Sequence, residues 1–154
     1  MKKRFFLTIA ILIVILVATF VLYCNNLSGV DPITIGYYNE CKVLLQQKGY
    51  TPNFLVVSAK RFKWHNAIQV RTSGAAKQSQ HIPGKAIDFI VFDINRDGKS
   101  DSKDVNLVYE ILDKQIMKDK GGIGTYKKEQ SFLYRQMIHI DCRGITKRWV
   151  ESPN

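Results

Sequence analysis

The chain passes from a polar loop into an apolar segment at Ser79-Gln80-His81-Ile82-Pro83-Gly84-Lys85-Ala86-Ile87-Asp88. Ala86 to Phe92 reads as a β-strand, because it is a short apolar run that follows turn residues. Pro83 and Gly84 predict a loop that folds His81 back toward this strand. The imidazole of His81 and the carboxylate of Asp88 are therefore expected to lie close together.

A second pair of metal-ligating residue types lies in the segment 132–142, which also reads as a strand. His139 and Asp141 are two residues apart, so strand alternation places both side chains on one face. His81, Asp88 and His139 form a three-ligand set suited to catalytic Zn²⁺, with a fourth position left for water. Zinc would lower the pKa of that water and polarise a carbonyl group. By spacing alone, three unrelated polar residues at strand ends remain the alternative.

The other patterns predict a small mixed fold. The 154 residues suffice for one domain with one packed core. Apolar spacing predicts helices at 33–47 and 102–118, and a short apolar run predicts a strand at 54–57. The polar segment 58–80 is expected to be mostly loop, and 121–124 to be a flexible loop. We expect an α+β fold, with a small mixed or antiparallel sheet and flanking helices.

The N-terminal segment predicts contact with a membrane. No charged residue occurs between Phe5 and Tyr23, which follow a basic start, and such a run is long enough to cross a bilayer as a helix. We expect residues 1–24 to form a transmembrane helix that anchors the protein, 25–32 to form a linker, and 33–154 to form the functional domain. Cleavage as a signal peptide, or lipidation at Cys24, stays open. In each case the domain would work outside the cytoplasm, on the periplasmic or cell-wall side.

The chain is strongly basic. Lys and Arg number 23 against 13 Asp and Glu, which gives a net charge of +10. A basic exported domain would be drawn to anionic surfaces such as cell-wall polymers or lipid headgroups. The basic residues are scattered and no nucleic-acid reading motif occurs, so nucleic acid is not an expected partner.

The pattern at 79–88 resembles the signature of the zinc D-Ala-D-Ala carboxypeptidase and Hedgehog-type peptidase superfamily. The resemblance extends from about residue 56 to 149, and several segments are similar to the exported YcbK-like branch. In chain order these segments are Val57-Ser58-Ala59-Lys60-Arg61, Gly121-Gly122-Ile123-Gly124-Thr125-Tyr126, Met137-Ile138-His139-Ile140-Asp141 and Arg148-Trp149.

The resemblance implies the roles of several residues. It implies zinc ligands at His81, Asp88 and His139, and at Arg61 an arginine that binds a substrate carboxylate or polarises its carbonyl group. A guanidinium suits that role because its fork can donate two hydrogen bonds. The implied activity is a zinc metallopeptidase, carboxypeptidase or endopeptidase, that hydrolyses D-amino-acid-containing amide bonds in peptidoglycan stem peptides or cross-links. The alternative is a catalytically inactive cell-wall-binding module of the same fold.

The chain departs from the family pattern at the general base. Many relatives have Glu or Asp three residues before the last zinc histidine, and this chain has Gln136, which cannot accept a proton at neutral pH. Asp141 is the nearest acidic replacement and is our candidate catalytic base. A second role for Asp141 also stays open, in which it orients an imidazole ligand without touching the substrate. The departure at Gln136 is the best support for the inactive module.

Residues 93–104 have the spacing of a 12-residue EF-hand calcium loop, with Gly98 at the sharp turn. The last position holds Asp rather than Glu, and an ion-free turn is the alternative. Bound Ca²⁺ would have a structural role. The predicted calcium ligands are Asp93, Asn95, Asp97, Lys99 through its backbone carbonyl, Asp101 and Asp104.

The chain has three cysteines. Cys41 and Cys142 would pair if they met in an oxidising compartment, and such a bond would brace the strand that carries His139. The alternative is two free thiols. Cys24 is then the unpaired one.

Overall fold

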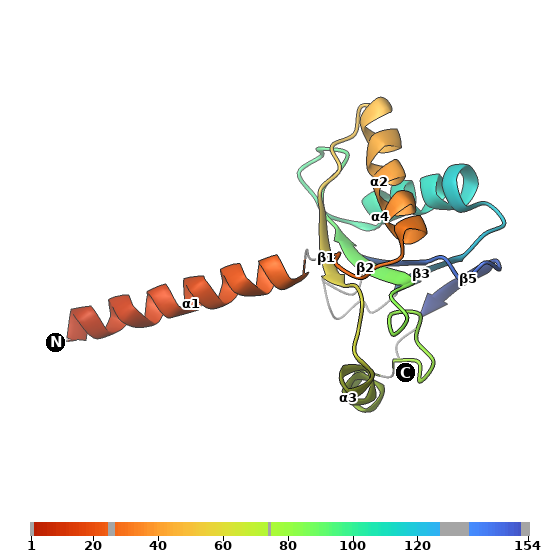
Figure 1. The fold of residues 1–154 in the computed structure, drawn as a ribbon. Coiled ribbons are helices and arrows are strands. Elements are labelled where there is room, and N and C mark those ends of the chain that lie inside the picture. Colours follow the sequence, from red (N-terminus) through yellow and green to blue (C-terminus); the bar gives the residue numbers. More distant parts are fainter. Residues whose placement is uncertain (1, 25–26, 74, 127–135, 152–154) are drawn as a thin grey trace.

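The computed structural model describes residues 2–24, 27–73, 75–126 and 136–151. Five strands form one sheet, with the helices distributed around it (Figure 1). In chain order the elements are α1 Lys2–Cys24, α2 Pro32–Gln47, β1 Phe54–Ser58, α3 Lys63–Ser73, β2 Ala86–Val91, α4 Ser102–Ile111, the π-helix η1 Leu112–Met117, β3 Gly122–Tyr126, β4 Met137–Asp141 and β5 Lys147–Glu151.

The strands lie in the order β1-β2-β4-β3-β5. The pairs β1–β2, β2–β4 and β3–β4 are antiparallel, whereas β3 and β5 are parallel. The structure is therefore α+β, with a mixed sheet and flanking helices, as the sequence predicts. β2 lies inside the sheet and is buried along its whole length, which explains its nearly continuous apolar sequence.

The hydrophobic core lies between one face of the sheet and the helices α2 and α4 (Figure 1). Side chains that alternate along β2 and β4 point into it, among them Phe89, Ile138 and Ile140, all fully buried. The Phe89 ring packs against Tyr38 of α2 with ring centroids 5.3 Å apart. Because the even-numbered residues of β4 fill the core, its odd-numbered residues face the opposite side of the sheet, where α3 lies.

Both core helices start with an acidic cap. The carboxylate of Asp31 accepts a hydrogen bond from the backbone N–H of Ile33 at 2.9 Å, and Pro32 occupies the first turn of α2. Asp101 and Asp104 form a capping box at the start of α4. These local signals support the helices expected at 33–47 and 102–118, the second of which continues through the π-helix η1.

The structure contradicts the expectation of a transmembrane helix at residues 1–24. In the part of the chain that the structure describes, no helix combines the length and the apolar character needed to cross a bilayer.

Two segments expected to be loops are regular elements. Residues 63–73 form α3. Much of this helix is exposed, including Trp64 and Ile68, so its sequence lacks the apolar periodicity by which a helix is predicted. Residues 122–126 form β3, where glycine is required by packing rather than by flexibility. A Cβ on Gly124 would lie 2.3 Å from the ring of Trp149. Glycine in a strand can thus mark a close approach instead of a turn.

Candidate metal centre

One row of residues crosses the sheet on the face opposite the core. Strand register pairs Ser58 of β1 with Asp88 of β2, and Asp88 with His139 of β4. It then pairs His139 with Gly124 of β3, and Gly124 with Trp149 of β5. The sheet therefore places a carboxylate, an imidazole and an indole side by side. The carboxylate of Asp88 and the imidazole of His139 come from positions 51 residues apart in sequence.

His81 reaches this row from the loop before β2. The loop is held by backbone hydrogen bonds from Gly84 N to His81 O at 3.2 Å and from Lys85 N to Gln80 O at 2.8 Å. Gly84 has φ +78°, and a Cβ there would lie 2.3 Å from the carbonyl oxygen of Gly29. Only glycine fits this turn without strain. The turn directs His81 back over the start of β2.

The structure brings His81, Asp88 and His139 together. His81 Nε2 lies 3.0 Å from Asp88 Oδ2, and His139 Nδ1 lies 2.7 Å from Asp88 Oδ1. One potential ligand atom from each residue falls within 4.8 Å of the others. All three residues are buried, with exposed fractions of 2%, 6% and 7% in chain order.

The hydrogen-bond partners of the two imidazoles fit a metal ion. His81 Nδ1 lies 2.7 Å from the carbonyl oxygen of Ala59, which only accepts, so Nδ1 carries the hydrogen. In neutral His81, Nε2 then presents a lone pair to Asp88. His139 Nε2 faces the carboxylate of Asp141 at 3.0 Å, and in the neutral tautomer that carries its hydrogen on Nε2 the ring presents the Nδ1 lone pair to Asp88.

Two imidazole lone pairs and a carboxylate thus converge on one small volume. Such acceptors repel one another unless a proton or a cation lies between them. Two nitrogens and one oxygen form a common donor set for catalytic zinc. The residues present therefore fit the ion that the sequence resemblance implies.

The pKa values of His139 and Asp88 reflect the same need for positive charge between the acceptors. Burial alone would lower the pKa of His139, but the charge of Asp88 and the hydrogen bonds to Asp141 and Asp88 raise that pKa to about 9. Burial opposes ionisation of Asp88, yet the positive charge of the two imidazoles holds the pKa of Asp88 well below its usual range. When no cation is bound, the proton on His139 supplies positive charge beside Asp88.

Asp141 is fully buried and its carboxylate is surrounded by donors. Oδ1 accepts hydrogen bonds from the backbone N–H groups of Gly122 and Arg143, both at 3.1 Å, and from Arg143 Nε at 2.7 Å. Oδ2 accepts from Arg143 Nη2 at 2.5 Å and faces His139 Nε2. Burial raises the pKa of Asp141, but the hydrogen bonds from His139 and Arg143 outweigh it and keep that pKa low.

Arg61 lies on the other side of the centre, with 6% of its surface exposed. Its Nη2 donates to Ser58 Oγ at 2.7 Å and lies 3.7 Å from Asp88 Oδ2. Its Nη1 donates to Asn66 Oδ1 at 3.1 Å. Burial lowers the pKa of Arg61 and the charge of Asp88 partly offsets this, but a guanidinium remains charged in proteins. The structure therefore places a positive guanidinium beside Asp88, in addition to the two imidazoles.

Trp149 closes the row on the β5 side. Its ring centroid lies 5.1 Å from that of His139, and the guanidinium carbon of Arg143 lies 5.5 Å from the indole. Sequence reasoning placed Trp149 in a motif without giving it a role. The signal that was missed is the pair of glycines in β3, because Gly124 leaves the space that the indole occupies. Arg143 was also missed, because Asp141 had been considered only as a base or as the partner of an imidazole ligand.

Gln136 lies outside this constellation. Its backbone carbonyl accepts a hydrogen bond from Val91 N at 2.9 Å, which extends the β2–β4 ladder by one residue. Alternation along β4 would place its side chain on the core face with Ile138, away from His139. It is fully buried, and neither polar side-chain atom has a hydrogen-bond partner in the structure as described.

The loop 93–104 gives no support to calcium binding. Among the residues that the structure describes, the only acid, His or Cys cluster arranged to hold an ion is His81, Asp88 and His139. The loop carboxylates accept hydrogen bonds from the loop backbone instead, as Asp93 does from Asp97 N and Gly98 N. Asp104 accepts from Ile94 N, Asn95 N and Asp101 N. Asn95 and Asp97 likewise accept from Asp97 N and Lys99 N, and Asp101 caps α4. The calcium site stays a prediction.

The two described cysteines are free. Cys41 is buried in α2, and burial raises the pKa of its thiol to about 12. Cys142 follows β4 and is half-buried. The structure therefore corresponds to the free-thiol alternative, and the side chain of Cys24 lies outside the described residues.

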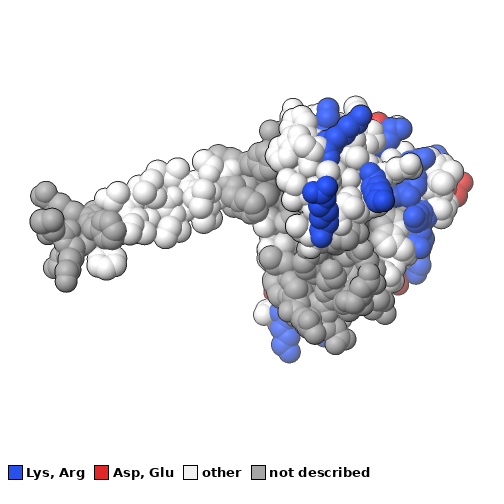
Figure 2. Space-filling model, turned by 90° about the horizontal axis from the view of Figure 1, so that it is seen from below, with Lys and Arg blue, Asp and Glu red and all other residues white. Residues whose placement is uncertain are grey.

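The surface around the fold is basic where it is described. Figure 2 shows many Lys and Arg side chains on the face seen from below, and few Asp or Glu. The net charge of +10 agrees with this distribution. It favours anionic partners over cationic ones.

The comparison with protein families agrees with this geometry. Residues 25–149 match the family model described as peptidoglycan L,D-endopeptidase MepK, and no curated protein matches the chain. The match includes Arg61, His81, Asp88, His139 and Asp141. The resemblance to zinc peptidases of the Hedgehog and D-Ala-D-Ala carboxypeptidase type is confirmed, and the family acts as peptidases on peptidoglycan. The chain thus belongs to the peptidoglycan L,D-endopeptidase MepK family.

Proposed function

We propose that this protein is a zinc-dependent endopeptidase that hydrolyses an amide bond between an L- and a D-configured centre in peptidoglycan. Family membership supports the peptidase activity and the substrate class. The observation that carries the zinc dependence is the convergence of His81 Nε2, His139 Nδ1 and the Asp88 carboxylate in a buried site. The endopeptidase assignment follows the description of the family.

His81, Asp88 and His139 would hold the ion. Bound there, Zn²⁺ supplies a Lewis acid that polarises a carbonyl group and a water of lowered pKa. The carbonyl of Ala59 fixes the ring of His81, because it accepts the hydrogen on Nδ1 at 2.7 Å. The ligand atoms are therefore oriented by the chain before an ion arrives, which reduces the cost of ordering them on binding.

Asp141 acts in this proposal as a positioning residue rather than as the base. Every lone-pair direction of its carboxylate already has a donor, and none of its surface is exposed. A base must reach a proton of the substrate or of water. A carboxylate that accepts the distal hydrogen of a ligating histidine fixes its tautomer and ring orientation. Of the two roles that the sequence leaves open, the contacts support this one.

Arg61 provides positive charge beside the reacting group. Ser58 and Asn66 hold its guanidinium in place, and each of its two Nη atoms retains a hydrogen beyond the bonds described. A fixed guanidinium can donate to a carbonyl oxygen that gains negative charge as the amide bond breaks. In this proposal Arg61 contacts the substrate, whereas Asp88 and the two histidines hold the ion.

The proposal places the protein outside the cytoplasm, because its substrate lies in the cell wall. The basic surface supports this placement, since wall polymers are commonly anionic. A second reading, an inactive wall-binding module, is favoured only by the absence of an acid at Gln136. The following experiment separates the two.

Purified full-length protein loaded with zinc is incubated with two cross-linked muropeptide dimers, one joined by an L,D bond and one by a D,D bond. Chromatography should show monomers from the L,D dimer, and none with the His139→Ala variant. Intact dimers after incubation with stoichiometrically zinc-loaded wild-type protein would overturn the enzyme and leave the binding module. Cleavage of the D,D dimer alone would overturn the bond assignment.

A further inference from the structure

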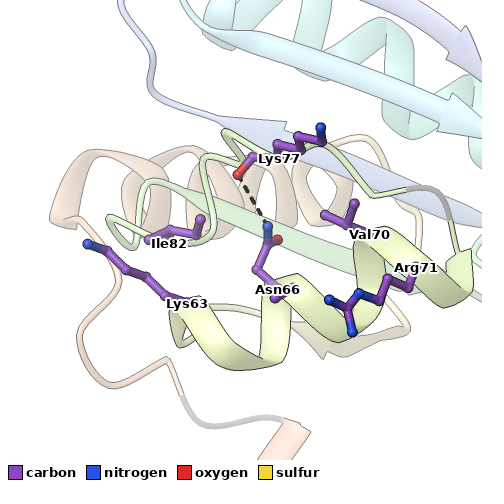
Figure 3. Close-up of a pocket in the computed structure, with 7 residues that line it drawn as sticks. Lys63, Asn66, Val70, Arg71, Lys77 and Ile82 are labelled. Carbon is purple, nitrogen blue, oxygen red and sulfur yellow. Dashed lines mark hydrogen bonds between the residues drawn. The ribbon is translucent and has the colours of Figure 1, made fainter.

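A pocket with a volume of about 440 Å³ opens next to the metal centre, between α3 and the loop that leads to β2 (Figure 3). It is distinct from the volume enclosed by His81, Asp88 and His139, none of which lines it. Its lining residues come from α3 and from the segment 77–82. They are Lys63, Asn66, Ala67, Val70, Arg71, Lys77 and Ile82.

The pocket is cationic on an apolar base. Three of its lining residues, Lys63, Arg71 and Lys77, are positively charged and exposed, and none is acidic. Among the described residues no carboxylate forms an ion pair with any of the three. Ala67, Val70 and Ile82 supply small apolar side chains between them. Cations without acidic neighbours favour an anionic ligand.

Two lining residues connect the pocket to the metal centre. Ile82 follows the ligand His81 directly in sequence. Asn66, which is buried, accepts a hydrogen bond from Arg61 Nη1 at 3.1 Å and donates through Nδ2 to the carbonyl oxygen of Ala76 at 3.1 Å. It thereby ties α3 to the loop. A ligand that occupies the pocket would lie on the Arg61 and His81 side of the centre.

The charged groups are spread over the pocket. Figure 3 shows the ends of Lys63, Arg71 and Lys77 on different sides of Asn66 rather than around one point. Such a spacing does not suit a single compact anion. It suits a flexible ligand with several separated negative groups, while the apolar base suits short aliphatic groups between them.

We propose that this cationic pocket binds the free carboxylates of the peptidoglycan stem peptide on one side of the cleaved bond. The inference rests on the proposed function and adds a substrate-binding site to it. Stem peptides carry α-carboxylates on a γ-linked glutamate and on diaminopimelate, and methyl groups on alanine. These groups match the separated cations and the apolar base. The pocket therefore contributes to selection of the peptide, whereas the metal centre acts on the bond.

The test compares two soluble probes. One is the tripeptide L-Ala-γ-D-Glu-meso-diaminopimelate, and the other is the same tripeptide with the glutamate and diaminopimelate α-carboxylates amidated. Calorimetry on zinc-loaded full-length protein measures the Kd of each. The variants are Lys63→Ala/Arg71→Ala, which removes two pocket charges, and Lys48→Ala as a matched control. Lys48 is an exposed lysine at the end of α2, on the opposite side of the sheet (Figure 1).

The wild-type protein should bind the free acid about 10-fold more tightly than the amidated probe, since two partly solvated ion pairs are each worth a few-fold. The double variant should lose this preference, and Lys48→Ala should keep it. Equal binding of both probes by the wild-type protein would overturn the pocket assignment, as would a preference that survives in the double variant. Melting temperatures confirm that the surface variants fold.

Failure of this inference can be told apart from failure of the proposed function. A protein that discriminates the probes yet does not cleave the cross-linked dimer keeps the pocket and loses the enzyme. A protein that cleaves the dimer with the same KM in the wild type and in Lys63→Ala/Arg71→Ala keeps the enzyme and loses the pocket. If both hold, the double variant should raise KM with kcat unchanged, because it removes uniform binding.

Discussion

His139 Nε2 lies 3.0 Å from Asp141 Oδ2, while Nδ1 of the same ring faces Asp88 at 2.7 Å. A histidine held between two carboxylates has one nitrogen for each. If Asp141 accepts the hydrogen on Nε2, Nδ1 is left to bind a cation together with Asp88. This relationship supports a positioning role for Asp141, in which it sets the tautomer of His139, over the role of a base.

The first prediction concerns this pair. Asp141→Asn should weaken zinc binding by about 10- to 100-fold, because the orienting acceptor of His139 is lost. Activity should return when zinc is added in excess. Zinc affinity is measured by competition with a chelating dye, and turnover is measured on the same preparation.

Asp113→Asn is the control for this prediction. The carboxylate of Asp113 accepts a hydrogen bond from Arg148 Nε at 2.6 Å and is not part of the metal centre. The control variant should leave zinc affinity unchanged. If Asp141→Asn retains full zinc affinity and loses turnover that added zinc does not restore, Asp141 is the base and the positioning role is wrong.

The second prediction concerns Trp149 and the glycine beneath it. Gly124→Ala should displace the indole, because a Cβ at that position would lie 2.3 Å from the ring. Trp149 neighbours His139, so the change should lower kcat/KM by about 10-fold or more, the scale of a misplaced site residue. Tryptophan fluorescence should report the displacement. Because the chain has 2 Trp residues, the measurement is made in a Trp64→Phe background, where Trp149 is the remaining tryptophan.

Gly36→Ala is the matched control for Gly124→Ala. Gly36 lies inside α2 with nothing within 4 Å of the added Cβ, so alanine should stabilise the helix by about 1 kcal/mol and leave activity unchanged. Unchanged activity in a Gly124→Ala variant whose fluorescence reports a displaced indole would show that Trp149 has no part in the site.

The third prediction concerns pH in the metal-free protein. The pKa of His139 is raised to about 9 in the folded state, against about 6.5 for an unfolded chain. A raised folded pKa gives stability that is fully present below about 6.5 and lost as pH rises through about 9. The melting temperature in the presence of a chelator should therefore fall between pH 6.5 and 9.

The zinc-loaded protein should not show this fall, since the ion replaces the proton. The buried thiol of Cys41, with its pKa raised to about 12, is expected to reduce stability only at pH values above about 9. A melting temperature of the metal-free protein that stays constant or rises between pH 6.5 and 9 would contradict the ionised arrangement of His139 with Asp88.

The fourth prediction concerns Gln136. A buried amide without partners destabilises the fold, so Gln136→Met should raise the free energy of unfolding by about 1 kcal/mol or more. Activity should not change, because alternation places the side chain on the core face. Gln47→Met on exposed α2 should change neither quantity. Loss of turnover in a stably folded Gln136→Met variant would place Gln136 in the catalytic machinery.

Sequence reasoning succeeded where local pattern and tertiary environment agree. The apolar run from Ala86 and the turn at Pro83 and Gly84 predict a strand and a returning loop, and the structure has both. It failed at α3, where an exposed helix lacks apolar periodicity, and at β3, where Gly124 makes room for a side chain distant in sequence. Contacts between strands that are distant in sequence cannot be read from one segment alone.

The same limit applies to the site. The sequence grouped His81, Asp88 and His139 through a family resemblance, since spacing alone left unrelated residues as an alternative. The donors around Asp141 include Gly122, which reaches it only when β3 and β4 pair, and Arg143, whose side chain folds back onto it. The two roles of Asp141 were therefore distinguishable only by its surroundings.

The central claim is that His81, Asp88 and His139 hold a zinc ion needed for peptidoglycan hydrolysis. The most direct measurement removes metal from the full-length protein with a chelator and titrates zinc back, while cleavage of an L,D-linked muropeptide dimer is followed. We predict that cleavage stops, recovers fully at one equivalent of zinc, and never recovers in His139→Ala, which should retain no stoichiometric zinc. Full cleavage by the metal-free protein, or stoichiometric zinc in His139→Ala, would contradict the account.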